Sequence, residues 1–103
     1  MLIILNKFGT TLVSRSAGKE ALLAYEPILK NIKPGESVEI DFDGVIAMGP
    51  SWGDEFLTPL FEKYKGQIKL LNTENPSVKA TLEMLEKIRG NQPLTSPPDK
   101  NPT

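Results

Sequence analysis

The chain alternates between two hydrophobic periods, and this alternation limits the folds that it can adopt. Short β-branched or alternating stretches predict strands, and longer stretches with apolar residues at helical spacing predict amphipathic helices. The predicted strands are 1–6, 10–14, 37–42 and 67–71. The predicted helices are 17–32, 51–64 and 76–89. This order of elements indicates an α/β domain in which helices connect neighbouring strands.

The first two predicted strands are close enough in sequence to form a hairpin. Only Lys7-Phe8-Gly9 separates them, and Gly9 can adopt the backbone angles that a tight turn requires. We therefore expect a mixed four-stranded sheet with three helices, in the order β-β-α-β-α-β-α. Strands should be parallel wherever a helix connects them.

Capping signals predict where the three helices begin. Ser16 is a plausible N-cap of the first helix. Ser51 is the predicted N-cap of the second helix, where Asp54 completes a Ser-x-x-Asp capping box. The third helix is predicted to begin at Asn75-Pro76, because proline is tolerated at the first helical position.

The apolar stripes of the helices are predicted to share one core. Pro27 and Pro59 fall inside the first two stripes and should bend those helices, and Gly90 should end the third. The residues expected to face inward are Ala21, Leu22, Tyr25, Ile28, Leu29, Ile32, Trp52, Phe56, Leu57, Leu60, Phe61, Tyr64, Val78, Leu82, Leu85 and Ile88.

The predicted domain spans residues 1–90, and residues 91–103 form a tail of different composition. The tail holds four of the nine prolines and a single leucine. So little apolar material does not offset the entropy of ordering the chain, which predicts a disordered Pro-rich tail.

The composition excludes several classes of chemistry. The chain has neither Cys nor His, so thiolate nucleophiles, imidazole bases and the usual zinc ligands are missing. The formal net charge of -1 argues against a nucleic-acid partner. The apolar start is too short for a membrane span, so we expect a cytoplasmic protein without a cofactor or a membrane partner.

The stretch Ile-Asp-Phe-Asp-Gly-Val-Ile at 40–46 allows an enzymatic hypothesis. It resembles the first motif of the haloacid dehalogenase phosphatases, in which a strand delivers Asp-x-Asp-Gly. The resemblance implies a magnesium-dependent phosphohydrolase with Asp41 as nucleophile and Asp43 as acid and base. The other parts of that machinery, a later Ser or Thr, a Lys and a second acidic pair, do not follow in the expected order.

The same carboxylates also have a structural interpretation. Short carboxylates at the end of a strand accept bonds from backbone N–H groups and organise turns, here together with Gly44. This interpretation requires no catalysis and is compatible with a binding role.

A second resemblance covers most of the predicted domain, from Phe8 to Glu86. The chain resembles the STAS-like family DUF4325, related to the sulfate-transporter and anti-anti-sigma-factor (STAS) domains. The residues that carry the resemblance are Phe8-Gly9, Leu12, Ser14-Arg15, Gly18, Asp41-Phe42, Gly44-Val45 and Ser51-Trp52-Gly53-Asp54-Glu55-Phe56. The resemblance implies a single STAS-like domain.

The resemblance also implies a function. Anti-anti-sigma factors are similar in carrying a Ser or Thr at the start of the helix that follows this strand, where a GHKL-type kinase phosphorylates it. Ser51 falls at that position, although Gly49-Pro50-Ser51-Trp52 differs from the Asp-Ser-Ser/Thr-Gly of those proteins. Ser51 is therefore the phosphoacceptor candidate, with capping of the helix as the alternative.

The remaining candidate residues surround Ser51 in the predicted fold. The guanidinium of Arg15 is predicted to pair with Asp41, Asp43 or Asp54, or to remain solvated. Trp52 is predicted to pack in the core, with an exposed partner anchor as the alternative. The partner-binding candidates are Arg15, Asp41, Asp43, Gly44, Trp52, Asp54 and Glu55.

The sequence thus predicts a non-enzymatic regulatory module that binds a GHKL-type ATPase or kinase. The predicted surface is the 43–50 loop with the first turns of the second helix. The phosphohydrolase is the alternative, and a nucleotide or anion site at the start of that helix is a third hypothesis.

Overall fold

In the computed structural model, which describes residues 1–88, every pair of strands is parallel. A three-stranded sheet has the order β1-β3-β5. Its strands are β1 (Leu2–Ile4), β3 (Val38–Asp41) and β5 (Ile68–Leu71). A separate two-stranded sheet pairs β2 (Thr11–Leu12) with β4 (Ala47–Met48). The α/β class is confirmed, and the mixed four-stranded sheet is wrong.

The predicted N-terminal hairpin is also wrong. A 3-10 helix, η1 (Leu5–Phe8), leads the chain out of the first sheet and buries Leu5 completely in the core. β1 then pairs with β3, with Ile3 opposite Ile40, whereas β2 pairs with β4. The predicted 43–50 loop therefore contains a strand, β4. Both β1 and β2 pair with strands that are far away in the sequence.

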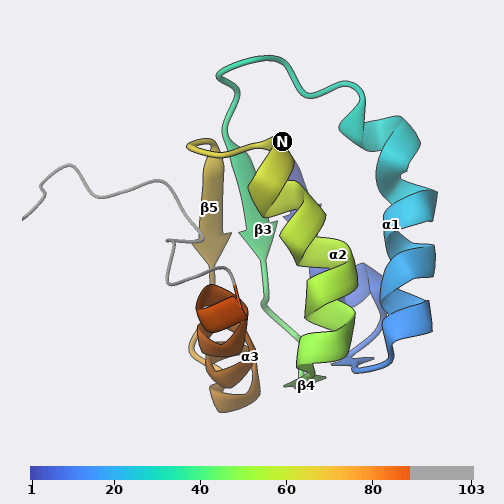
Figure 1. The fold of residues 1–103 in the computed structure, drawn as a ribbon, viewed down its shortest axis with the longest axis vertical. Coiled ribbons are helices and arrows are strands. Elements are labelled where there is room, and N and C mark those ends of the chain that lie inside the picture. The colour runs from blue at the N-terminus through green and yellow to red at the C-terminus, as the bar shows by residue number, and fades with distance from the viewer. Residues whose placement is uncertain (89–103) are drawn as a thin grey trace, which may run out of the picture.

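Within residues 1–88, three helices accompany the sheets, as predicted. They are α1 (Arg15–Leu29), α2 (Pro50–Lys63) and α3 (Pro76–Ile88). In Figure 1, α2 lies in front of the three-stranded sheet, α1 lies beside α2, and α3 lies beyond the lower end of β5. The helices run opposite to the parallel strands, so all three helices begin at the end of the molecule where the strands finish.

The helix starts differ from the prediction in two of three cases. Ser14 rather than Ser16 caps α1, because its hydroxyl accepts a bond from the N–H of Ala17 at 3.1 Å. The third start is confirmed: the Oδ1 of Asn75 accepts bonds from the next helix N–H groups. Both predicted internal prolines lie inside helices.

One hydrophobic core joins the helices and the sheets. The largest fully buried side chains are Trp52, Phe42, Phe56 and Phe61. The rings of Phe8 and Tyr25 extend this group, with the Phe8 centroid 5.1 Å from that of Phe56. Most predicted core positions are buried or partly buried, but Ile28 is 44% exposed and Ile88 is 61% exposed.

Two glycines allow the helices to pack closely. A Cβ atom at Gly18 of α1 would lie 2.7 Å from the backbone oxygen of Trp52, and one at Gly53 of α2 would lie 3.1 Å from the Cγ2 of Thr81 in α3. The first turns of α1 and α2 are therefore in contact, and α2 lies against α3.

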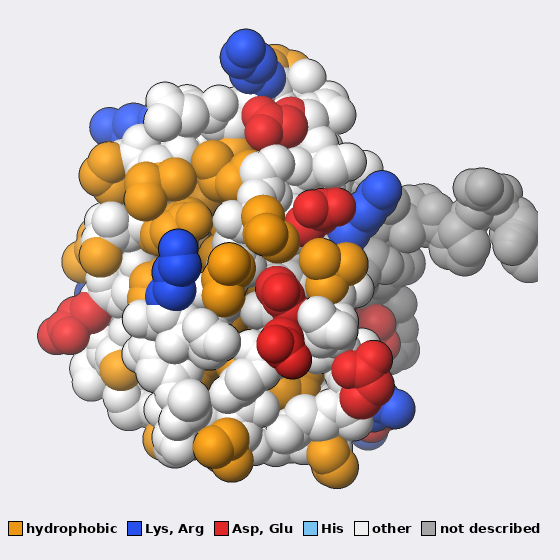
Figure 2. All heavy atoms as spheres, turned by 180° about the vertical axis from the view of Figure 1, so that it is seen from behind, with side chains coloured by type: hydrophobic (Ala, Val, Ile, Leu, Met, Phe, Trp, Pro, Cys, Tyr) orange, Lys and Arg blue, Asp and Glu red, His pale blue; other side chains and the backbone are white. Residues whose placement is uncertain are grey.

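Helices cover one face of the three-stranded sheet more fully than the other. Val38 and Ile40 of β3 are fully buried, whereas the alternating Glu39 and Asp41 are partly exposed. Figure 2 shows the molecule from behind, where hydrophobic side chains are exposed among charged ones.

Two predictions cannot be compared with this structure, because Gly90 and the 91–103 tail lie outside the described residues. Among the helices of residues 1–88, none is long and apolar enough to cross a membrane.

Candidate functional site

The Asp41 carboxylate organises the turn that follows β3. Its Oδ1 accepts a bond from the N–H of Asp43 at 2.9 Å and another from the Nδ2 of Asn72 at 2.7 Å. The bond from Asn72, and then the bond from Asp43, lowers the pKa of Asp41 below its ordinary value. The prediction that the Asp41 carboxylate accepts a backbone N–H bond and organises the turn is therefore confirmed.

Gly44 is required by the geometry of the same turn. Its φ is +85°, and the N–H of Val45 donates to the carbonyl of Phe42 at 3.1 Å. A Cβ atom at Gly44 would lie 2.6 Å from the Nδ2 of Asn6, which donates to the carbonyl of Asp43. A larger residue would therefore strain the backbone and displace Asn6.

Substitution of Asp41 by Asn should change how stability depends on pH. A carboxyl whose pKa is lowered in the folded state stabilises the fold above its unfolded pKa, about 3.9. This stabilisation disappears as the pH falls through the lowered pKa that the carboxyl has in the folded state. Wild type should therefore be more stable than Asp41→Asn at pH 7, and the difference should shrink below about pH 4.

Urea denaturation of both proteins from pH 7 to pH 2.5 measures this effect. Glu36 serves as an internal reference, because bonds from the Lys33 N–H and the N-terminal amine also lower its pKa, and it is present in both proteins. Parallel pH curves for the two proteins would contradict the assigned role of Asp41.

Arg15 connects the starts of α1 and α2. Its Nη1 donates to the Oδ2 of Asp54 at 3.1 Å and to the Oε2 of Glu55 at 2.8 Å. These bonds, with that to Glu55 the larger cause, raise the pKa of Arg15. The predicted pairing with Asp54 is confirmed, and pairing with Asp41 or Asp43 is wrong.

The contact between Arg15 and the two acids follows from the helix packing. The missing side chain of Gly18 brings the first turns of α1 and α2 together, one turn from Arg15. The Oδ1 of Asp54 also accepts a bond from Thr58 at 3.0 Å, which fixes its orientation. Because these charges are partly exposed and screened by solvent, the ion pairs contribute little to stability.

Ser51 does not cap α2, so the predicted capping box is wrong. Gly49 is the N-cap, and Pro50 takes the first helical position, for which its missing N–H and fixed φ suit it. The N-cap therefore lies two residues earlier than predicted, and Ser51 occupies the second position of the helix. Its half-buried hydroxyl makes no hydrogen bond within the part of the chain that the structure describes.

Trp52 is a core residue, as predicted. Its side chain is 1% exposed and stacks on Phe56, with 4.9 Å between ring centroids. Direct contact between Trp52 and a partner would require the side chain to leave the core, so the alternative of an exposed anchor does not fit this structure.

Asparagines that the sequence analysis did not select hold the surrounding loops. Asn75 donates through its Nδ2 to the carbonyls of Val45 and Ile46, at 3.2 and 3.1 Å, while its Oδ1 caps α3. The Asn-Pro helix start predicted the cap but not the bridge to the 43–50 segment. No sequence motif predicted the role of Asn72, whose φ is +58°.

The candidate residues thus form two groups at the same end of the molecule. Asp41, Asp43 and Gly44 form a turn held by two asparagines, and Arg15 forms a charged cluster with two acids of α2. Among residues 1–88, no hydrogen bond or ion pair is found between the two groups. Nor is any set of three or more Asp or Glu side chains placed to hold a metal ion in that range.

Comparisons with known proteins place the chain in a family. The family described as a STAS-like domain of unknown function (DUF4325) matches residues 25–78, more than half of the sequence. Neither the curated proteins nor the solved structures contain a match. The matched range includes the Asp41 turn and Ser51 with the first turns of α2. The chain therefore belongs to the STAS-like family DUF4325.

Proposed function

We propose that this STAS-like domain is a non-enzymatic regulatory module that binds a protein partner. The binding surface is formed by residues 43–50 and the first turns of α2, and the partner is a GHKL-type ATPase or kinase that phosphorylates Ser51. The observation that carries the proposal is the position of the Ser51 hydroxyl: it lies at a helix start and, among residues 1–88, has no hydrogen bond to give up.

A phosphate at Ser51 would change the charge of this surface strongly. It would add about -1.5 to -2 charges at pH 7, one helical turn from Asp54 and Glu55. Repulsion from these acids opposes the attraction of the helix N-terminus, which is worth about 0.3–1 kcal/mol and up to ~2 kcal/mol where the charge is partly buried. Arg15 has further guanidinium donors within the same cluster that could bind the phosphate.

Substitutions at Ser51 should separate this role from a structural one. We expect Ser51→Glu to weaken partner binding at least tenfold, because it adds a negative charge one helical turn from Asp54 and Glu55 at the proposed contact. Ser51→Ala should change the affinity less than about threefold, since the Ser51 hydroxyl makes no hydrogen bond within residues 1–88, but should abolish incorporation of phosphate.

The measurement has two parts. Proteins retained from a lysate of the source organism by immobilised wild type are identified by mass spectrometry, and the affinity of a retained GHKL-type ATPase is then measured with each purified variant. Ser16→Glu is the matched control, because Ser16 occupies the second position of α1 as Ser51 does in α2. The absence of such an ATPase, together with unaltered behaviour of both Ser51 variants, would refute the proposal.

The phosphohydrolase alternative is tested separately. The Oδ1 of Asp41 already accepts two hydrogen bonds, which supports an organising role over nucleophilic attack. Turnover of p-nitrophenyl phosphate with Mg²⁺ that disappears in Asp41→Asn would establish the enzyme. An absence of turnover with Mg²⁺, Mn²⁺ and Co²⁺ would eliminate it.

A further inference from the structure

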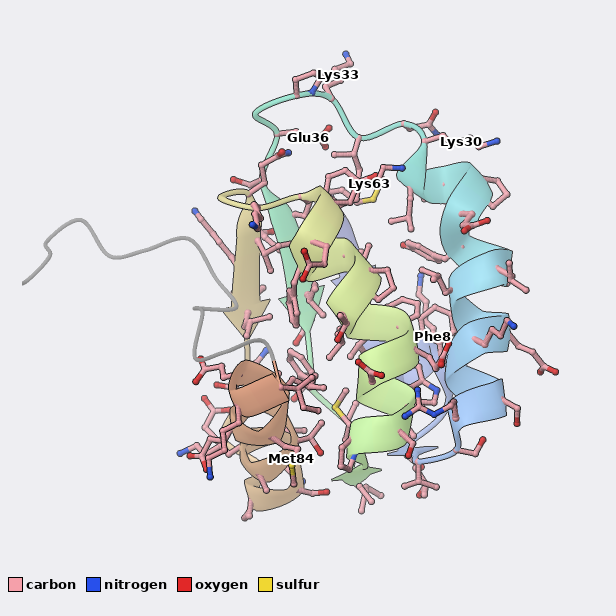
Figure 3. The ribbon with its side chains drawn as sticks, viewed as in Figure 1. Phe8, Lys30, Lys33, Glu36, Lys63 and Met84 are labelled. Carbon is pink, nitrogen blue, oxygen red and sulfur yellow. The ribbon has the colours of Figure 1, made fainter. Side chains whose placement is uncertain are left out.

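A groove lies beside the proposed binding surface, between the start of α2, β4 and α3. Its volume is about 220 Å³. The residues that line it are Met48, Pro50, Ser77, Ala80, Thr81 and Met84. Figure 3 shows Met84 on the side of α3 that faces the start of α2. The groove is therefore next to Ser51, the neighbour of Pro50 in the chain.

The polar atoms of the groove are already bonded within the fold. The Ser77 hydroxyl accepts a bond from the N–H of Met48 at 2.9 Å and donates to the Met48 carbonyl at 3.0 Å. The Thr81 hydroxyl donates to the same carbonyl at 2.7 Å. What remains open to an occupant is a methionine, proline and alanine surface, which suits an apolar side chain.

Large apolar side chains are also exposed around the groove. Met84 is 46% exposed at its wall, and Ile46 is 67% exposed just before β4. Val13, which is 49% exposed, lies within 3.6 Å of a Cβ position at Gly49 and thus beside the start of α2. Apolar side chains exposed together in this way are typical of protein contact sites.

The charge around this end of the molecule is acidic. At the last residue of each strand, on the segments that follow the strands and on the first two turns of the helices, the acidic side chains are Glu20, Asp41, Asp43, Asp54, Glu55 and Glu74, against Lys7, Arg15, Lys19 and Lys79. Arg15 is already paired with two of the acids. Figure 3 shows Lys30, Lys33 and Lys63, together with Glu36, at the opposite end of the molecule.

We propose that this groove receives a large apolar side chain from a basic segment of the protein partner. The apolar lining selects a side chain such as leucine or phenylalanine, and the surrounding carboxylates attract the lysines or arginines beside it. The inference rests on the proposed function and specifies the chemistry of the partner and the part that α3 plays in the contact.

Methionine methyl groups provide a direct measurement. Of the three methionines, Met48 and Met84 line the groove, whereas Met1 lies at the other end, where its amine bonds Glu36 and Ser37. The whole chain, labelled with ¹³C in the methionine methyls, is titrated with the peptide Lys-Arg-Leu-Leu-Arg-Lys. We expect saturable shifts of the Met48 and Met84 signals and a constant Met1 signal.

Altered peptides and one pair of variants test each part of the proposal. The peptides Glu-Asp-Leu-Leu-Asp-Glu and Lys-Arg-Ser-Ser-Arg-Lys should bind at least tenfold more weakly. Ala80→Lys should weaken binding of the original peptide tenfold or more, because it places bulk and positive charge in the groove. Ala24→Lys is the matched control on the exposed side of α1 and should leave the affinity unchanged.

Three outcomes would overturn the proposal. Equal affinity for the charge-reversed peptide would show that the site does not select a basic segment. Shifts at Met1 as large as those at Met48 and Met84 would show that the peptide does not bind specifically in the groove. Shifts of Met48 and Met84 on concentrating the chain alone would identify a second copy as the occupant. If Ser51 variants alter capture of the ATPase while the peptide does not bind, only this inference fails; if the peptide binds and no ATPase is captured, only the proposed function fails.

Discussion

Replacement of Trp52 by Ala should lower the free energy of unfolding by about 3–5 kcal/mol, the range expected when a large aromatic side chain is removed from a core. Trp52 is 1% exposed and stacks on Phe56, and its ring centroid lies 6.1 Å from that of Phe8. The substitution therefore leaves a cavity that several rings border. Such a loss is large against the total stability of about 5–15 kcal/mol that is usual for a small domain.

Urea denaturation followed by far-UV circular dichroism measures this loss, because removal of the only tryptophan also removes its fluorescence. Leu23→Ala is the control, since Leu23 is 56% exposed on α1 and should cost less than about 0.5 kcal/mol. A loss below about 1 kcal/mol for Trp52→Ala, with binding of the partner abolished, would instead make Trp52 an anchor in the interface.

The helices and the two longer strands could be predicted because their patterns are long enough to carry a period. Val38 to Asp41 alternates between buried and exposed side chains, and the buried positions of α2 follow helical spacing. The N-terminal strands are different. β1 and β2 are three and two residues long, too short to show a period, and hairpin proximity was misleading because β1 pairs with residues 39–41.

The candidate site was predictable in its location and less so in its contacts. In a parallel α/β fold, strand ends and helix starts share one end of the molecule, and the order of elements alone therefore predicts that Arg15, Asp41 and Ser51 lie at that end. The sequence left three acidic partners open for Arg15, because the choice depends on how α1 approaches α2. The start of α2 was displaced by Pro50, a stronger signal for the first helical position than the Ser51 cap.

Gly18 illustrates a residue whose role only tertiary structure reveals. Glycine inside a helix costs roughly 0.5–1 kcal/mol relative to alanine, so propensity alone predicts that Gly18→Ala stabilises the protein. The structure predicts the opposite sign. An alanine Cβ would lie 2.7 Å from the backbone oxygen of Trp52, and a backbone atom cannot move aside as a side chain does.

Gly18→Ala should therefore destabilise the domain by about 1–3 kcal/mol, as overpacked sites do, measured by urea denaturation at pH 7. Gly53→Ala is the matched comparison, because its Cβ would meet only side-chain atoms, Thr81 Cγ2 at 3.1 Å and Leu85 Cδ1 at 3.2 Å. We expect a change within about 1 kcal/mol there, since the gain in helix propensity offsets the crowding.

The same pair of variants tests how the fold assembles the charged cluster. If α1 moves away from α2 in Gly18→Ala, the guanidinium of Arg15 loses its fixed distance to Asp54 and Glu55, and Arg15→Ala should then cost less in that background than in wild type. Gly53→Ala should leave the cost of Arg15→Ala unchanged. If Gly18→Ala instead stabilised the domain, α1 and α2 would be free to separate. The close packing at Gly18 would then not be the cause of the position of Arg15 at the start of α2.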